Sequence, residues 1–336
     1  MTPRGLIVTA LAAACTMAVL LWLARCSSDL RAAQVLHTAF EEGVREPVHT
    51  AGFTAVRAGS GWRDWRTETD LNRARARTVT REPGSTVTLL DDGHRVWRLG
   101  QAGATPLQPS PRQVDWALLG RNYRIRAAED GEVAGQPATG VALESRRTGR
   151  TAEALWIETG RNLIVRRWTY DADGHLVVQT EVEDVRSQGY AEGRDRLEAA
   201  LARLPATPSE TPLTDAQFAE RAGFTPLRPA RVPKGYREVG LFARTCPRGR
   251  TYAELVYFDG LRVLSIFERP GGGPGGGQGR GFGHRRGQAA HAETPDPVLV
   301  DEGQAKTVRV RRGSVRVFVT ADLTQQEILR VVNSIP

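Results

Sequence analysis

Cysteine is scarce in this chain, and the scarcity excludes a disulfide framework. The three cysteines are Cys15, Cys26 and Cys246. The first two lie in or beside an apolar N-terminal run, so Cys246 is alone in the rest of the chain. No Cys-x-x-Cys pair occurs, which removes the commonest zinc and thiol-redox signatures. An intramolecular disulfide therefore does not frame the fold.

The sequence also lacks the patterns that carry catalysis or metal binding. No two of the six histidines lie four residues apart, as in a His-x-x-x-His zinc site, and no Gly-x-Ser-x-Gly elbow is present. The turn at Asp171–Gly174 is similar to the start of a calcium loop but has no third acidic ligand and no distal Glu at loop spacing. We therefore predict a protein that is not an enzyme and that uses no metal and no cofactor.

Lysine is almost absent as well. The formal net charge is +8, yet the only lysines are Lys234 and Lys306, so nearly all positive charge is arginine. The arginines are scattered along the chain and do not gather on one predicted helix. Without a clustered basic motif, the sequence predicts no nucleic-acid partner.

One long apolar run is present, and it lies at the N-terminus. Residues Gly5–Ala24 carry no charge and are long enough to span the roughly 30 Å core of a bilayer as a helix. Residues 1–27 are thus predicted to be a signal peptide or a membrane anchor. The stretch Leu23–Cys26 also resembles a lipobox, although Arg25 replaces its usual small residue. The sequence leaves open whether this segment is cleaved, retained or lipidated at Cys26. In each case the bulk of the protein is predicted to be exported, to the periplasm or another extracytoplasmic space. If residues 5–24 are retained, they anchor the protein in the inner membrane.

Most of the chain reads as β-structure in two parts. Residues 50–186 contain many runs that alternate apolar and polar, which predicts strands with one buried face, and the turn at Asp91–Gly93 predicts a hairpin. Ser28–Phe40 and a segment ending at Leu204 have helical spacing. The Pro-rich stretch 205–213 predicts a linker, and residues 214–336 are predicted to form a smaller α+β domain. This domain contains a Gly-rich loop at 271–288, and its last helix begins with a capping box at Thr324–Glu327.

Tryptophans are concentrated in the first part and absent from the second. They fill a core, or they line a wide concavity of a curved sheet, and the sequence leaves both interpretations open. Trp97 and Leu99 alternate onto one face of a predicted strand, as do Trp168 and Tyr170. These four residues are the predicted ligand-binding lining.

Several motifs resemble those of a known family. The stretches Leu118–Arg146 and Leu155–Val177 are similar to the N-terminal domain of the RseB/MucB family, itself similar to the lipoprotein carriers LolA and LolB. Val232–Phe242 and Leu255–Pro270 are similar to motifs of its second domain, with Phe258 in place of the usual serine. The resemblance extends over about residues 35–336.

This resemblance implies a LolA-like incomplete antiparallel β-barrel packed on helices over residues 28–204, followed by the smaller α+β domain with an antiparallel sheet. It further implies a non-catalytic envelope regulator that binds the exported segment of a membrane anti-sigma factor, with lipid or lipoprotein acyl chains as a second ligand. The alternative is a LolA-like lipid or lipoprotein carrier. The second domain and the apolar N-terminus disfavour that alternative, because simple carriers have no such domain and must diffuse freely.

Overall fold

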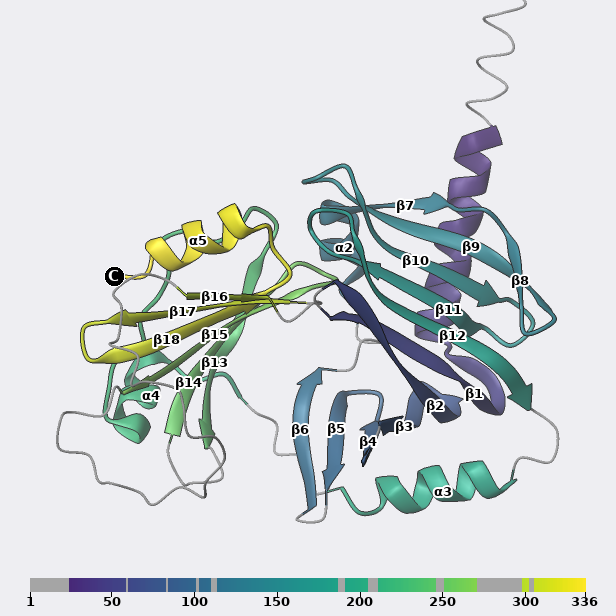
Figure 1. Ribbon diagram of the computed structural model, residues 1–336, viewed down its shortest axis with the longest axis horizontal. Helices are drawn as coiled ribbons and strands as arrows, with labels where there is room; N and C mark the ends of the chain where they lie inside the picture. Colours follow the sequence, from purple (N-terminus) through teal and green to yellow (C-terminus); the bar gives the residue numbers. More distant parts are fainter. Residues whose placement is uncertain are drawn as a thin grey trace, which may run out of the picture.

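The computed structural model describes residues 24–58, 60–82, 84–100, 103–109, 114–186, 191–204, 211–245, 251–270, 298–301 and 305–336 (Figure 1). The predicted anchor, apart from Ala24, and the Gly-rich loop 271–288 therefore lie outside the described residues, as do residues 205–210 of the predicted linker. Within the described ranges, no helix is both long enough and apolar enough to cross a membrane.

A 12-stranded sheet forms the first domain, and its strands run mostly as a meander. The order is β6-β5-β4-β3-β2-β1-β12-β11-β10-β9-β7, with β8 paired to β9. The two ends of the meander meet where β1 pairs antiparallel with β12. The strands are β1 (Val44–Ala58), β2 (Gly61–Arg73), β3 (Arg75–Glu82), β4 (Ser85–Asp91), β5 (Arg95–Gly100), β6 (Gly103–Pro109), β7 (Tyr123–Ala127), β8 (Gly131–Val133), β9 (Gln136–Ser145), β10 (Thr151–Glu158), β11 (Leu163–Tyr170) and β12 (Leu176–Arg186).

The predicted antiparallel, incompletely closed barrel is confirmed, because β6 and β7 end the sheet without pairing to each other. The predicted hairpin at Asp91–Gly93 joins β4 to β5. Gly93 takes a φ of 89°, and its backbone N–H donates to Asp91 Oδ1 at 2.9 Å. A side chain at this φ is strained, so the glycine is what permits so tight a turn.

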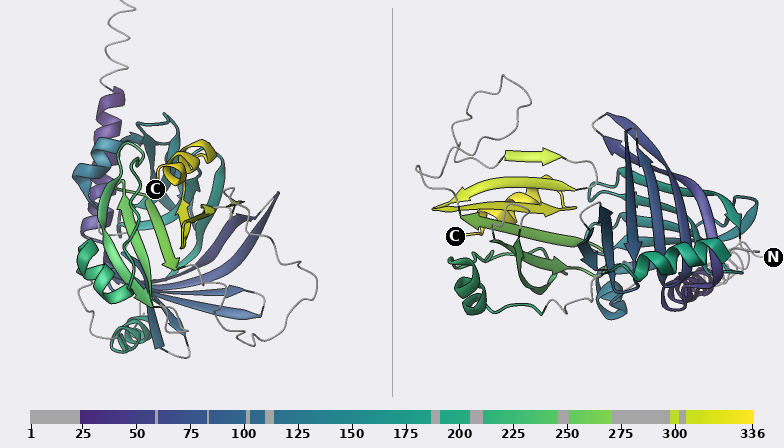
Figure 2. Two further views of the ribbon diagram at one scale, coloured as in Figure 1. Left: turned by 90° about the vertical axis from the view of Figure 1, so that its left-hand side faces the viewer. Right: turned by 90° about the horizontal axis from the view of Figure 1, so that it is seen from below.

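Helices cover both faces of this sheet, at different places. A helix over residues 24–41 packs Ala32, Leu36 and Ala39 against β9 and β10. The helix α3 (Ala191–Leu201) lies across the strands at the other end of the sheet, as the right-hand view of Figure 2 shows. The short helix α2 (Trp116–Asn122) begins at the N-cap Asp115, whose side chain accepts from Leu118 N–H.

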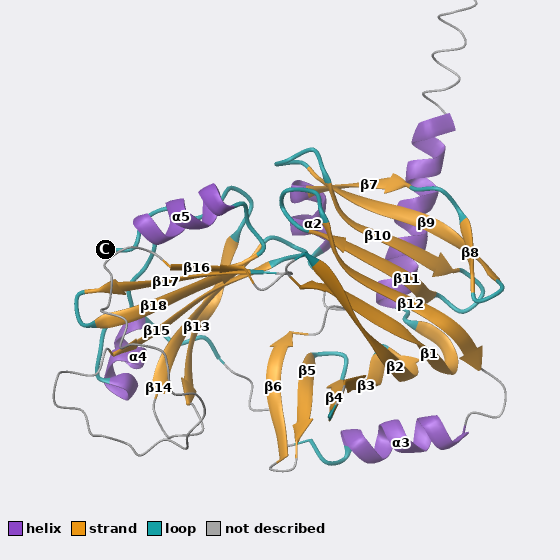
Figure 3. Cartoon of the chain, viewed as in Figure 1, coloured by secondary structure: helices purple, strands orange, loops and turns teal. Residues whose placement is uncertain are grey.

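The second domain is a 6-stranded antiparallel sheet with two helices packed on one face. Its order is β13-β14-β15-β18-β17-β16 (Figure 3). The strands are β13 (Arg237–Thr245), β14 (Thr251–Phe258), β15 (Val263–Pro270), β16 (Val298–Asp301), β17 (Lys306–Arg312) and β18 (Val315–Ala321). The helices α4 (Asp215–Ala222) and α5 (Gln325–Asn333) both begin with capping boxes, and the one at Thr324–Glu327 is as predicted.

Candidate binding surfaces

The four residues predicted to line a cradle share one face of the first sheet but do not lie together. Trp97 pairs with Leu90 across β5 and β4, whereas Trp168 pairs with Gln179 across β11 and β12. The strands β4, β3, β2, β1 and β12 lie between β5 and β11. At the usual spacing between strands this separation is roughly 29 Å along the sheet. The structure therefore places the predicted lining in two distant pairs.

Trp97 and Leu99 lie beneath α3. Trp97 is 2% exposed and packs in a cluster with Leu90, Leu197 and Ala200, against which Leu99 is partly buried. The indole Nε1 of Trp97 donates to Asp92 Oδ2 at 2.9 Å. A ligand reaches this pair only if α3 moves away.

Ion pairs hold α3 on the sheet beside that apolar cluster. Arg196 of the helix donates to the buried carboxylate of Asp70, and Arg75 of β3 donates to Glu198 of the helix at 2.6 Å. Asp70 also accepts from Arg77 at 3.2 Å and lies 2.9 Å from His49 Nδ1. The helix is thus attached through both its apolar and its charged side chains.

Trp168 and Tyr170 lie at the other end of the same face. Trp168 stacks edge-on against Trp156 at 4.8 Å between ring centroids, and the guanidinium of Arg166 lies over both rings. Glu181 accepts two hydrogen bonds of 2.8 Å from Arg166 and so fixes its position. Tyr170 is half-buried, which raises the pKa of its phenol, and its carbonyl accepts from Arg262 of the second domain.

The opposite face of the first sheet carries an apolar area that sequence reasoning missed. The register places Leu155, Arg167, Thr180, Thr54 and Trp65 in one row across β10, β11, β12, β1 and β2. The N-terminal helix packs on this face at β9 and β10. Over β1 to β5, however, none of the described helices has its apolar contacts on this face.

This area, which we call the threonine face, consists of half-buried side chains on β1, β2, β3 and β4. They are Thr54, Trp65, Thr67, Thr69, Thr78, Thr80, Val87 and Leu89. Threonine hydroxyls on it hydrogen-bond to one another, with 3.2 Å between Thr69 and Thr78. A hydroxyl that already has a partner can be covered by an apolar chain at a lower desolvation cost than one without. The exposed Arg98 lies opposite Leu89 at the edge of this area.

The signal that identifies the threonine face was the alternation of β4. Leu89 and Leu90 are neighbours in the sequence and must point to opposite faces. Nothing local says which one α3 covers, because α3 is about a hundred residues further along the chain. The sequence therefore did not distinguish the covered leucine from the uncovered one.

Polar side chains join the two domains. Tyr123 OH donates to Asp259 Oδ2 at 2.7 Å, and Asn122 Nδ2 donates to the carbonyls of Asp259 and Gly235 at 2.7 and 2.9 Å. Gly260 has a φ of 101° and approaches Leu119 of α2 so closely that a Cβ would meet its backbone at 2.6 Å. Only glycine fits this contact between the domains.

A buried ion pair completes this junction. Arg262 pairs with Asp322, and Arg262 also donates to the carbonyls of Ala152 and Tyr170 in the first domain. Asp322 in turn accepts from Ala172 N–H at 3.1 Å. Burial raises the pKa of Asp322 to about 6, while Arg262 opposes that shift. The pair is anchored on both domains and fixes how they sit against each other.

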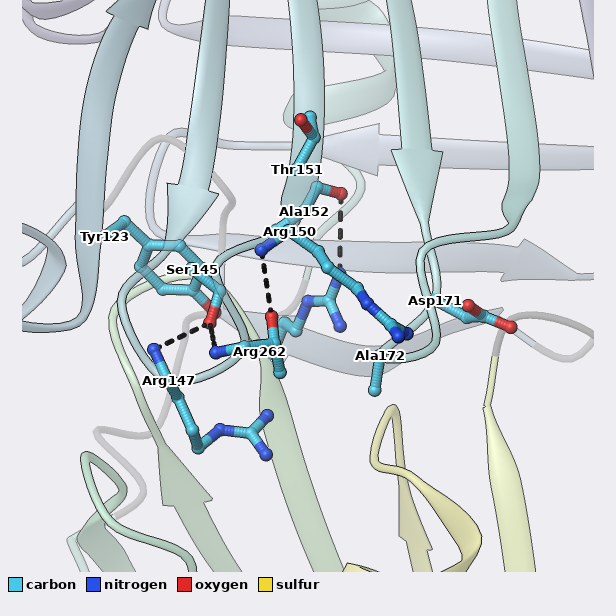
Figure 4. Close-up of a pocket in the computed structure, with 10 residues that line it drawn as sticks. Tyr123, Ser145, Arg147, Arg150, Thr151, Ala152, Asp171, Ala172 and Arg262 are labelled. Carbon is cyan, nitrogen blue, oxygen red and sulfur yellow. Dashed lines mark hydrogen bonds between the residues drawn. The ribbon is translucent and has the colours of Figure 1, made fainter.

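A small hollow lies at the junction, lined by Tyr123, Arg147, Arg150, Asp171 and Arg262 among others (Figure 4). Its volume is about 10 Å³, which is room for roughly one water molecule. Arg147 pairs with Glu327, and Arg262 pairs with Asp322. The hollow is therefore a packing feature of the junction and too small for an organic ligand. No group of three or more His, Cys, Asp or Glu side chains that could hold a metal occurs among the described residues.

Comparison with known proteins gives a family-model match for part of the chain and a fold for almost all of it. A family model described as the MucB/RseB N-terminal domain matches residues 71–206. A chain in the structure of the Pseudomonas aeruginosa MucA/MucB complex is 18% identical, with a TM-score of 0.62 over 92% of this chain and 98% of that chain. A structure of MucB with MucA(peri) matches at 18% identity and a TM-score of 0.58, over 91% of this chain and 97% of that one.

Other comparisons add less. MucB alone matches at 18% identity and a TM-score of 0.56, over 91% of this chain and 98% of that chain. A LolA superfamily protein from Nitrosomonas europaea also matches, but its TM-score of 0.27 is too low to support an argument. The search of curated protein sequences gave no match. Residues 71–206 are therefore similar to the MucB/RseB N-terminal domain, and the chain has the two-domain fold of MucB along almost its whole length.

Proposed function

We propose that this protein is a non-catalytic extracytoplasmic regulator that binds the exported segment of a membrane anti-sigma factor. The observation that carries the proposal is the alignment of both domains with MucB, which has been solved in complex with MucA(peri). The junction at Arg262 and Asp322 supports it, because it holds both domains as one body that a single partner can contact.

We propose lipid as a second ligand, held on the threonine face. Trp65, Val87 and Leu89 provide apolar contact there, and the hydrogen bond between the Thr69 and Thr78 hydroxyls reduces the cost of covering these two threonines. Lipid bound there would regulate the partner only if lipid and partner favour different states of the protein or compete for it. A second predicted lining, on the opposite face of the sheet, consists of Trp97, Leu99, Trp168 and Tyr170. A ligand can reach Trp97 and Leu99 there only if α3 is displaced.

A LolA-like carrier is the alternative, and the second domain disfavours it. A carrier needs one apolar cradle, whereas this chain builds a further 6-stranded sheet and attaches it firmly to the first domain. We propose that the domains span residues 28–204 and 214–336, joined by the linker 205–213. The N-terminal residues 1–27 would export the protein or retain it at the inner membrane.

The proposal is tested by crosslinking the full-length protein in its own cells, followed by affinity capture and mass spectrometry of proteins and lipids. We expect one membrane protein with an anti-sigma domain on its cytoplasmic side as the main partner. Its purified exported segment should bind the protein directly and should be cleaved more slowly by protease in its presence. Acyl lipids or assorted lipoproteins without such a partner would overturn the regulator in favour of the carrier.

A further inference from the structure

The two faces of the second sheet differ sharply in chemistry. One face packs against α4 and α5, through a core that includes Phe218, Leu255, Ile266, Val319 and Ile328. Strand side chains alternate, so the neighbours of these core residues point to the opposite face. Both described helices of this domain pack on the core face, and none of them covers the other face.

The register places arginines side by side on that uncovered face. Arg316 of β18 pairs with Arg269 of β15 on one side and with Arg311 of β17 on the other. The row therefore concentrates positive charge on the uncovered face.

Aromatic rings form the next row, two residues along each strand. Phe267 pairs with Phe318, and Phe318 pairs with Arg309. The guanidinium groups of Arg269 and Arg309 lie over the Phe318 ring, at 5.3 and 5.9 Å from its centroid. Tyr252 and Phe267 are in contact at 6.1 Å between centroids. The arginines are thus supported on a layer of aromatic rings, which positions their charge outward.

Positive charge dominates this face. Among its described side chains, a single acidic residue, Glu254, accompanies the arginines, and it pairs with Arg244 at 2.6 Å. The arginines of the face are Arg237, Arg244, Arg269, Arg309, Arg311 and Arg316, of which Arg237 pairs with Asp115 of the first domain. Such an excess attracts an anionic partner, because complementary charge both speeds association and selects the partner.

We propose that this arginine–aromatic face is the docking surface for an acidic polypeptide segment with interspersed apolar residues. Its identification as the exported anti-sigma segment rests on the function proposed above. An extended segment presents side chains on one side about every 7 Å, which matches the distance from the arginine row to the aromatic row. Acidic side chains would contact the arginines, and apolar ones the rings between them.

The exposure of the rings favours a polypeptide over a membrane surface. Phe242, Tyr252, Phe258, Phe267 and Phe318 are all half-buried, and a single valine, Val263 opposite Phe258, is an exposed large hydrophobic side chain on this face. Insertion into a bilayer interface requires protruding aromatic or aliphatic side chains. Here the outermost groups are guanidiniums, which suit carboxylates of a flexible segment.

The test uses the full-length protein and a labelled 14-residue peptide in which glutamate and leucine alternate on one side of the extended chain. We expect binding that weakens with added salt and that is lost when glutamine replaces the glutamates. The double variant Arg269→Gln/Arg316→Gln should weaken binding at least tenfold. The matched control Arg221→Gln/Arg330→Gln makes the same charge change on the exposed sides of α4 and α5 and should bind as the wild type does.

Thermal unfolding separates docking from folding. The Tm of the Arg269→Gln/Arg316→Gln protein should stay within a few degrees of that of the matched control, so weaker binding by a folded protein supports the proposal. Equal binding by the two double variants would overturn it, as would binding to phosphatidylglycerol vesicles, but not to the peptide, that depends on Arg269 and Arg316. If the captured anti-sigma segment binds the Arg269→Gln/Arg316→Gln protein normally, the docking surface is wrong but the regulatory function stands. If no such segment is captured, the proposed function fails, whatever the result with the peptide.

Discussion

The two sheets are built alike but leave different surfaces uncovered. Each packs helices on apolar side chains, and each has an area that none of the described helices covers. On the first sheet that area is the threonine face around Trp65, Val87 and Leu89, whose named side chains carry no charge. On the second it is the arginine–aromatic face around Arg269 and Phe318.

This difference argues for a division of roles within one rigid body. A neutral apolar surface recognises a ligand by area, whereas rows of guanidiniums recognise charge. The lipid and the polypeptide proposed above would each use one of these surfaces. The junction at Arg262 and Asp322 connects the two sheets that carry them.

The largest effect on stability is expected from a substitution that removes the junction between the two sheets. Arg262→Met removes the cation opposite the buried Asp322 and the donor to the carbonyls of Ala152 and Tyr170. A buried carboxylate left without its partner typically costs 3–5 kcal/mol, and we expect a loss of about that size. Chemical denaturation measures it. The double variant Arg262→Met/Asp322→Leu should recover most of the loss, and failure to recover would show that the ion pair is not what joins the domains.

Neighbouring leucines on β4 distinguish the covered face from the uncovered one. Leu90 is 0% exposed under α3, so Leu90→Ala leaves a cavity and should cost about 3 kcal/mol of unfolding free energy. Leu89→Ala, on the half-buried threonine face, should cost less than about 1 kcal/mol. Both are measured by urea denaturation of the full chain. Equal losses would show that the threonine face is itself packed.

The buried carboxyl of Glu268, on the core face of the second sheet, should make the stability of this domain depend on pH. Burial raises the pKa of Glu268 to about 7 from an ordinary 4.5, against a hydrogen bond from Leu227 N–H that lowers it. The folded state therefore binds more protons than the unfolded state between these values. Stability should fall by about 3 kcal/mol as pH rises from 4.5 to 7, and the loss is complete above pH 7.

The check on Glu268 is a set of denaturation curves between pH 4.5 and 8. Glu268→Gln should remove most of the slope and leave the smaller contribution of Asp322, whose raised pKa acts in the same direction below pH 6. A Glu268→Gln protein with an unchanged slope would contradict the assignment.

Local patterns predicted the elements, and long-range pairing decided the surfaces. The hairpin at Asp91–Gly93 and the capping box at Thr324–Glu327 depend only on side chains within a few residues of the backbone groups they satisfy. Those features, the meander and the α+β class were predictable from the sequence, and the family resemblance supplied the open barrel.

The site was less predictable, because which face a helix covers is set by contacts far apart in sequence. The alternation of β5 predicts that Trp97 lines a cradle, but Trp97 is covered by α3, which begins more than ninety residues later in the chain. The arginine row likewise needs the pairing of β15 with β18 across the Gly-rich segment. Neither relation has a local signature in the residues involved.

The smallest expected effect on stability accompanies a large one on binding. Leu89→Asp introduces a charge on the half-buried threonine face, where solvent still reaches it, so it should cost less than about 2 kcal/mol. If lipid lies on this face, the variant should lose binding of a fluorescent long-chain fatty acid, measured at pH 7.5 with the full chain. Thr86→Asp, exposed on the same strand but pointing to the opposite face, should bind the probe as the wild type does. Retained binding by a folded Leu89→Asp protein would remove the threonine face as the lipid site. It would also leave the lining of Trp97, Leu99, Trp168 and Tyr170, on the opposite face, as the lipid site still predicted on the first sheet.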